Sequence, residues 1–291
     1  NNLSSLQYNF TLGVVDAATS GFAFSAKHSG VGLARKIGMD LALPYLSTLE
    51  SLIFCTDADT VVNKDYIKNV KTYFETTGAQ AAVVGFRHLK STDEKQEQSI
   101  HQYEEYLLTT AEKIKHAGSP YGYVAMGSTI VCTAKAYCAV GGMSRKKATE
   151  DFYFLQELTK FCGVHTISEI LVYPSPRPIS RVYLGTGFRM KQAKEGFDFN
   201  TLYYSDKAFQ ILKELIDLGR NAWGVEFSLL KKNTSIIHPH LTDFLLQEGI
   251  ENIWMNLQRN ATSKLHFSEQ FHRWFDGLKT IRLLKIITKN A

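Results

Sequence analysis

The sequence contains no uninterrupted run of about 18 apolar residues, so it predicts no membrane-spanning helix. Its first ten residues, NNLSSLQYNF, have neither the basic start nor the apolar stretch of a secretory signal. Only four cysteines occur, and no two of them form a C-x-x-C pair, which argues against a disulfide framework and a zinc site. We therefore expect reduced thiols in the protein core and a cytoplasmic protein.

The chain also lacks a strong excess of charge of one sign. Its 33 basic and 28 acidic residues give a net charge of +5, too small to indicate a nucleic-acid partner. No Gly-rich phosphate loop and no aromatic-basic RNA motif occurs. Apolar residues make up 44% and charged residues 21% of the sequence, as in ordinary globular domains. The 291 residues suffice for one large domain or two smaller ones.

Strand-like and helix-like segments alternate along the first two-thirds of the chain. This pattern predicts an α/β fold with a mostly parallel, Rossmann-like sheet flanked by helices over residues 1–195. Beyond it, helical periodicity predicts a helical extension over residues 196–291. Strands are expected at 12–16, 52–56, 81–86, 129–132 and 170–173. Helices are expected at 31–43, 65–77 (burying Ile67, Val70 and Phe74), 93–116, 134–140, 150–161, 202–219, 241–259 and 266–288.

Asp57 and Asp59 follow an apolar strand directly, in the segment LIFCTDADT. In parallel α/β sheets ligands bind beyond the carboxyl ends of the strands. Two carboxylates at positions i and i+2 can reach one hard cation, and oxygen ligands suit Mg²⁺ or Mn²⁺. The alternative is that both aspartates are solvated turn residues.

A second acidic pair, Glu150-Asp151, follows Thr149 and opens a helix. The helix dipole and the free backbone N–H groups are expected to lower the pKa of such a carboxyl, which would then be ionised and able to accept a proton from a hydroxyl. The alternative is ordinary capping of a helix by Thr149 and acidic first-turn residues.

Four segments together resemble the family 2 glycosyltransferases, which have the GT-A fold. They are GVGLARKIGMDLAL (30–43), LIFCTDADTVV (52–62), YVAMGSTIVCTAKAYCAVGGM (123–143) and TED (149–151), within a resemblance that covers about residues 12–190. The resemblance implies transfer of a sugar, of the hexosyl type, from a nucleotide-diphosphate sugar to a hydroxyl of a sugar, lipid-linked or small-molecule acceptor. Asp57 and Asp59 would hold the Mg²⁺ or Mn²⁺ that binds the diphosphate. Asp151 would be the base that makes the reaction inverting, and Glu150 would orient the acceptor.

The chain departs from the family pattern in two places. The family begins with two more strands, so we expect the transferase domain to be N-terminally incomplete. Arg35-Lys36 stands where the family more often has Arg-Asn. We expect Arg35 to contact the nucleotide-sugar, and the alternative is a solvated or core-bordering arginine.

Basic and histidine side chains elsewhere supply further candidates. Arg177, Arg181 and Arg189 lie in a loop rich in proline and glycine, and guanidinium groups there can close over a diphosphate, with Arg181 the first choice. His238 or His240 could supply a third metal ligand. The preferred alternative is that both are surface histidines in a turn.

The last 28 residues carry six basic and two acidic side chains. They predict a basic helix that packs on the protein or lies on the anionic inner face of a membrane.

Two rival functions remain open. The segment TDADTV also fits haloacid-dehalogenase-like phosphatases, in which Asp57 would attack phosphorus and Asp59 act as acid-base. A degenerate, non-catalytic transferase domain is the third hypothesis, because the first strands of the family pattern are missing.

Overall fold

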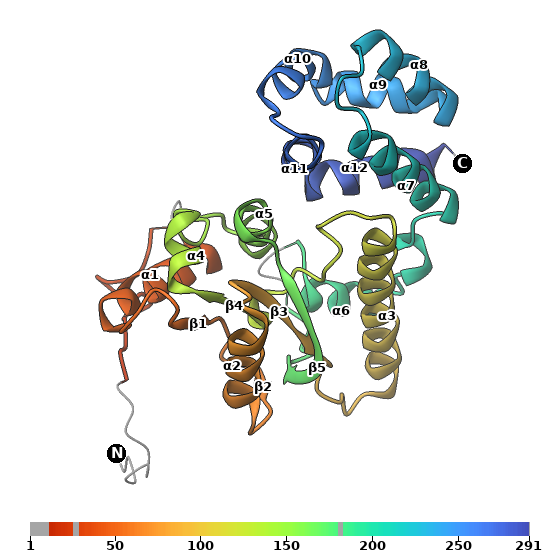
Figure 1. The fold of residues 1–291 in the computed structure, drawn as a ribbon. Helices are drawn as coiled ribbons and strands as arrows, with labels where there is room; N and C mark the ends of the chain where they lie inside the picture. The colour runs from red at the N-terminus through yellow and green to blue at the C-terminus, as the bar shows by residue number, and fades with distance from the viewer. Residues whose placement is uncertain (1–11, 26–28, 180–182, 291) are drawn as a thin grey trace, which may run out of the picture.

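The computed structural model describes residues 12–25, 29–179 and 183–290. Within these ranges the chain forms an α/β fold with twelve α-helices and one five-stranded sheet. The helices of the C-terminal third gather at one end of the molecule, above the sheet in Figure 1. No helix in the described ranges is both long enough and apolar enough to cross a membrane.

The sheet is mixed, so the prediction of a mostly parallel sheet is wrong. Its strand order is β1-β4-β3-β5-β2, and only the β3–β5 pair is parallel. A buried strand is apolar whichever way it runs, so the sequence pattern does not reveal that β4 is reversed. The strands are β1 (Leu52–Phe54), β2 (Val61–Val62), β3 (Ala81–Phe86), β4 (Ile130–Thr133) and β5 (His165–Tyr173).

Strands β1, β3 and β5 nevertheless point in one direction. β1 and β3 both run antiparallel to β4, and β5 runs parallel to β3. Their carboxyl ends therefore meet at one edge of the sheet. Asp57 and Asp59 follow β1 at this edge, as expected. This edge is where the polar residues discussed below converge.

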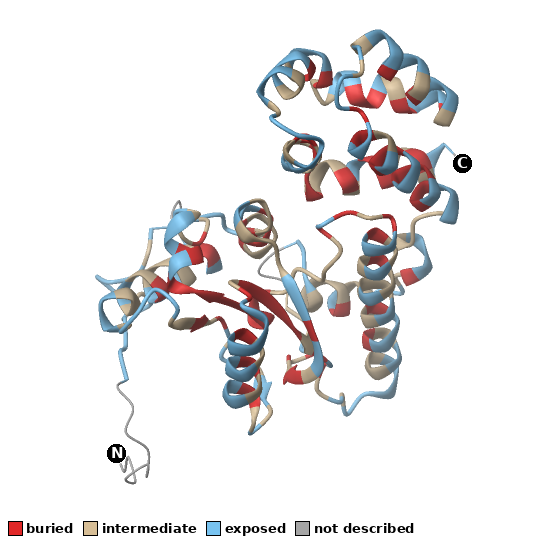
Figure 2. Ribbon diagram, viewed as in Figure 1, coloured by how far each residue is buried: buried red, intermediate tan, exposed pale blue. Residues whose placement is uncertain are grey.

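Helices cover both faces of the sheet, and its central strands β3 and β4 are almost entirely buried (Figure 2). On one face α1 (Val31–Ala42), α4 (Ala134–Ala139) and α5 (Glu150–Cys162) pack on apolar side chains that include Ile53 and Val83. The other face is covered by α2 (Tyr66–Thr77), with Leu107 of α3 (Glu94–His116) packed against the same core.

The predicted boundaries of α2 are confirmed, but its buried face is not. The helix ends at Gly78, whose φ of 69° is a left-handed conformation that glycine adopts readily. Its buried residues are Tyr66, Val70 and Phe74, whereas Ile67 is 65% exposed. Ile67 instead borders an open groove, so not every apolar side chain of α2 packs against the core.

After β5 the described chain is helical, and the C-terminal helices share a core around Trp254, Phe267 and Phe271. Two of the long helices that we expected are each broken in two, at Gly249 (φ 82°) and at Asp276, whose carboxylate accepts a hydrogen bond from Lys279 N. The elements are α6 (Thr186–Lys194), α7 (Asp206–Arg220), α8 (Phe227–Ile237), α9 (Pro239–Gln247), α10 (Ile250–Asn260), α11 (Lys264–Trp274) and α12 (Gly277–Lys289). Three 3₁₀ turns lie at η1 (Leu43–Tyr45), η2 (Gly127–Thr129) and η3 (Phe199–Leu202).

The apolar face of the basic helix α12 is buried in this core. Leu283, Leu284 and Ile287 are fully enclosed, and the helix packs on α7. A membrane surface would therefore meet only the charged side of α12.

Two further expectations differ from the structure. Residues 12–16 form no strand in the described chain, and Leu12, Val14 and Val15 are exposed. Cys55 and Cys132 are buried free thiols as expected, but Cys138 is exposed.

Candidate functional site

Arg35 joins the two acidic segments that the sequence analysis singled out. It lies in the second turn of α1, and its side chain is only 11% exposed. One guanidinium nitrogen, Nη2, is 2.5 Å from Oδ1 of Asp57, and the other, Nη1, forms an ion pair with Glu150. Asp57 follows β1 and Glu150 opens α5, so three segments far apart in the sequence meet at this guanidinium. The guanidinium of Arg35 thus contacts two carboxylates, and its expected contact with the nucleotide-sugar stays a prediction.

Asp151 lies beside this bridge without taking part in it. Its Oδ1 accepts a hydrogen bond of 2.8 Å from the backbone N–H of Phe152. The preceding residue, Thr149, has φ 64°, the one non-glycine residue with positive φ in the described ranges. Such a conformation is unusual for a β-branched residue and is found most often at functional sites. This turn directs the first residues of α5 toward Arg35.

The pKa values of both carboxyls are raised, contrary to our expectation of a lowered pKa. Burial, and next the charge of Asp151, raise the pKa of Glu150 to about 6, which the nearby Arg35 only partly offsets. Burial also raises the pKa of Asp151, against the backbone N–H of Phe152 and the charge of Arg35. The loss of hydration on burial therefore raises these two pKa values more than the helix N-terminus lowers them. A carboxylate with a raised pKa is a stronger base near neutral pH.

Two glycines make room for the bridge. A Cβ on Gly127 would lie 2.1 Å from Nη1 of Arg35, so the guanidinium occupies the space that any other side chain would fill. A Cβ on Gly32 would lie 2.3 Å from the carbonyl oxygen of Lys146 and 2.9 Å from Cβ of Glu150. Gly32 thus lets α1 approach the start of α5 closely. Neither glycine is recognisable from the sequence as part of the site.

Replacing Gly127 by alanine should displace the Arg35 guanidinium and destabilise the protein by about 1–3 kcal/mol, the usual cost of overpacking. Gly38→Ala is the matched control, because it lies in the middle of α1 and a Cβ there meets nothing within 4 Å. The control should be neutral or stabilising by up to about 1 kcal/mol. Equal denaturant midpoints for both variants would contradict the proposed packing.

Asp59 forms a second ion pair at the same edge of the sheet. Its Oδ2 is 3.0 Å from Nη2 of Arg177, which follows the carboxyl end of β5. Of the two loop arginines that the structure describes, Arg177 is the one that lies against the aspartate pair. Arg189 instead contacts Oε1 of Gln192 and the ring of Phe197, and Arg181 lies outside the described residues.

The site carries more acidic than basic groups. Four carboxylates (Asp57, Asp59, Glu150 and Asp151) face two guanidinium groups (Arg35 and Arg177), a formal charge of −4 + 2 = −2 when all are ionised. This excess suits a cation. Asp57 and Asp59 each use one carboxylate oxygen in an ion pair, so each retains a second oxygen as a ligand.

These residues fit a divalent cation that completes its shell with other oxygens. The described residues contain no group of three or more His, Cys, Asp or Glu side chains that would hold a metal unaided. Mg²⁺ commonly binds through one or two carboxylates together with water and phosphate oxygens. His238 does not supply a third ligand here: it lies between α8 and α9 in the C-terminal helices, where its Nδ1 accepts a hydrogen bond from His240 N.

The raised pKa of Glu150 should make the stability of the protein depend on pH. Glu150 has a pKa of about 6 in the folded chain against an ordinary 4.5, so its contribution is fully present below pH 4.5 and is lost as the pH rises through 6. The loss corresponds to about 2 kcal/mol. Glu150→Gln should remove this part of the pH dependence, whereas Glu251→Gln, at an exposed position of α10, should leave it unchanged. Parallel stability curves of Glu150→Gln and the unmodified chain between pH 4 and 8 would contradict this assignment.

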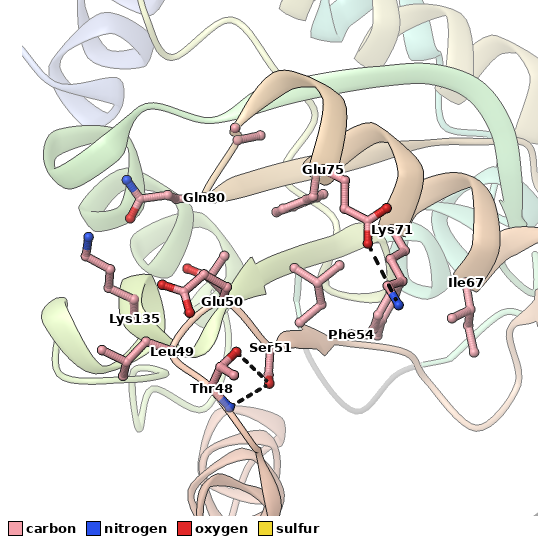
Figure 3. A pocket seen from close by; sticks show the side chains of 15 residues that line it. Thr48, Leu49, Glu50, Ser51, Phe54, Ile67, Lys71, Glu75, Gln80 and Lys135 are labelled. Carbon is pink, nitrogen blue, oxygen red and sulfur yellow. Dashed lines mark hydrogen bonds and ion pairs between the residues drawn. The ribbon is translucent and has the colours of Figure 1, made fainter.

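A groove of about 740 Å³ lies elsewhere in the described chain (Figure 3). It is lined by residues on the α2 side of β1 and includes none of the four carboxylates. In the carboxylate site Asp57 and Asp59 are about 40% exposed, whereas Glu150 is buried.

Comparison with known proteins adds no further constraint. Neither the models of known protein families nor the curated proteins give a match to this chain. The chemistry of the site is therefore the ground for a functional assignment.

Proposed function

We propose that the chain is a glycosyltransferase of the GT-A type, which moves a sugar from a nucleotide-diphosphate sugar to an acceptor hydroxyl. One observation carries the proposal: Arg35 ties Asp57 to Glu150, so the DxD segment and the TED segment share one site. The transferase hypothesis needs these segments to converge. A structure with the two segments on opposite sides of the sheet would have excluded it.

The residues take distinct roles in this proposal. Asp57 and Asp59 hold Mg²⁺ or Mn²⁺, which when bound neutralises the charge of the leaving diphosphate. Arg177, paired with Asp59 at the same edge, is placed to bind a phosphate oxygen. Asp151 accepts the proton of the acceptor hydroxyl, because its pKa is raised and its carboxylate is not bridged to Arg35. Inversion at the sugar carbon rests on the family resemblance.

Glu150 has a positioning role in this scheme rather than the orientation of the acceptor. It is only 3% exposed and is engaged by Arg35, so it is poorly placed to touch a ligand. Its carboxylate fixes the Arg35 guanidinium, which in turn fixes Asp57.

Replacing Asp59 by alanine should abolish metal-dependent binding of nucleotide diphosphates. Calorimetry with UDP and with GDP, each with and without Mn²⁺, measures this directly. Asp243→Ala, an exposed aspartate of α9, is the control and should bind as the unmodified chain does.

Three outcomes would count against the proposal. Unchanged affinity in Asp59→Ala would refute the metal role. Absence of any metal-dependent nucleotide binding by the unmodified chain would favour a non-catalytic domain. Turnover of a generic phosphoester that Asp57→Asn abolishes would instead support the phosphatase hypothesis.

A further inference from the structure

A buried histidine joins the end of β3 to the start of α6. The side chain of His88, two residues after β3, is only 1% exposed. Its Nδ1 is 2.7 Å from Oε1 of Glu104 in α3, and its Nε2 is 3.1 Å from Oγ1 of Thr186, the first residue of α6. Because both ring nitrogens have partners, the imidazole is held in one orientation. None of these three residues has a role in the proposed reaction.

The start of α6 lies against the backbone that carries Arg177. Ile179 N donates a hydrogen bond of 3.0 Å to the carbonyl of Gly187, the residue after Thr186. A Cβ on Gly187 would lie 2.9 Å from Cβ of Ile179 and 3.2 Å from the carbonyl oxygen of Arg177. Glycine at this position therefore lets the first turn of α6 touch residues 177–179. The hydrogen bond between His88 and Thr186 fixes that turn, and through it the backbone at Arg177.

Helix α3, which packs beside α6 (Figure 1), supports the same segment on the other side of Arg177. Gln96, in the first turn of α3, donates a hydrogen bond of 2.9 Å from Nε2 to the carbonyl of Pro176. Leu89 N donates to the carbonyl of Pro174 (2.8 Å). Both prolines are buried, and their rings fix φ. The backbone is therefore held on both sides of Arg177, whose own side chain is 61% exposed.

We propose that His88 and Gln96 are positioning residues, which hold the backbone around Arg177 so that its guanidinium lies beside Asp59 and binds a phosphate oxygen of the donor. This role rests on the proposed function. An exposed arginine pairs weakly with an exposed carboxylate, because both side chains lose conformational freedom on pairing. A backbone that is already fixed lowers the cost of ordering Arg177, and preorganisation of this kind raises the affinity for a ligand.

Gln96→Met removes the donor to Pro176 and keeps the length of the side chain. Calorimetry of the full chain with UDP and with GDP, each with Mn²⁺, should show about 2- to 10-fold weaker nucleotide binding in this variant, the range expected for one lost hydrogen bond. Gln98→Met is the matched control, because Gln98 is an exposed residue of the same helix. The control should bind as the unmodified chain does.

Thr186→Val removes the hydroxyl that contacts His88 and leaves the pair of His88 and Glu104 in place. We expect a loss of nucleotide affinity in the same range as for Gln96→Met. Thr186→Ser retains Oγ and should restore the affinity of the unmodified chain. A loss that serine does not restore would show that the hydrogen bond to His88 is not the cause, which would overturn the role of His88.

A double-mutant cycle separates positioning from a general structural effect. Arg177→Ala removes the group through which both positioning residues act. In this background, adding Gln96→Met or Thr186→Val should not weaken nucleotide binding further. If either substitution lowers the affinity as much in Arg177→Ala as in the unmodified chain, its effect does not pass through Arg177 and the inferred role is wrong.

Hydrogen exchange at Ile179 distinguishes failure of this role from failure of the proposed function, because it needs no nucleotide. The Ile179 amide should exchange at least about 10-fold more slowly than in an unstructured peptide, and Thr186→Val should speed this exchange. Fast exchange in the unmodified chain, or exchange that Thr186→Val leaves unchanged, would refute the support of Arg177 by the start of α6. A protected Ile179 in a chain that binds neither nucleotide with Mn²⁺ would instead refute the proposed function, and the positioning role with it.

Discussion

Asp151→Asn is expected to lower the rate of sugar transfer by about 10²- to 10⁴-fold, the usual contribution of a positioned general base. An asparagine amide keeps the size of the side chain and can still accept the hydrogen bond from Phe152 N, but it cannot take a proton. Binding of the donor should be unchanged, because Asp57 and Asp59 rather than Asp151 would hold the cation. The effect should therefore appear in kcat and not in the affinity for the nucleotide.

The measurement compares transfer rates and nucleotide affinity in the same preparations. Asp217→Asn, an exposed aspartate on α7, controls for the change in charge and should transfer at the normal rate. If Asp151→Asn transfers at nearly the unmodified rate, Asp151 is not the base. A loss of nucleotide binding in Asp151→Asn would place Asp151 in the donor site instead.

The candidate site could be located from the sequence because short strand and helix patterns mark its acidic residues. The apolar run before Asp57 predicted β1, and Thr149 with its acidic neighbours predicted the start of α5. Asp57 and Asp59 were expected at the carboxyl edge of the sheet, and Arg35 links Asp57 to Glu150 at the start of α5. This much follows from strand and helix patterns and from the position of polar residues after them.

The features that could not be predicted depend on tertiary contacts. The reversal of β4 leaves no trace in its apolar sequence IVCT, and Gly127 is recognisable as important only once Arg35 is seen to occupy its Cβ space. The raised pKa of Glu150 likewise comes from burial, which the sequence does not show, and it reverses the direction expected from the helix start. The ion pairs of Arg35 with Asp57 and Glu150 could not be predicted from the sequence either, because they join segments far apart in the chain.

Arg35→Met should reduce the free energy of unfolding by about 3–5 kcal/mol at pH 8, because it leaves the buried carboxylate of Glu150 without its cation. Asp57 contributes little to this loss, since its side chain is 43% exposed and remains solvated. Arg35 lowers the pKa of Glu150 in the folded chain, so its removal raises that pKa further above about 6. At pH 5 Glu150 can bind a proton in the variant, and the destabilisation should be smaller there than at pH 8.

Chemical denaturation at the two pH values measures both effects. Lys36→Met is the matched control, because Lys36 is the next residue of α1 and its partner Asp40 is 42% exposed, so its removal should cost about 1 kcal/mol or less. Adding Glu150→Gln to Arg35→Met should restore part of the stability at pH 8, since the double variant no longer buries an unpaired charge. If Arg35→Met and Lys36→Met are equally stable, or if the loss in Arg35→Met is the same at pH 5 and pH 8, the guanidinium does not compensate the charge of Glu150. The link between the two acidic segments would then be a contact without energetic weight, and the proposed site would lose its main support.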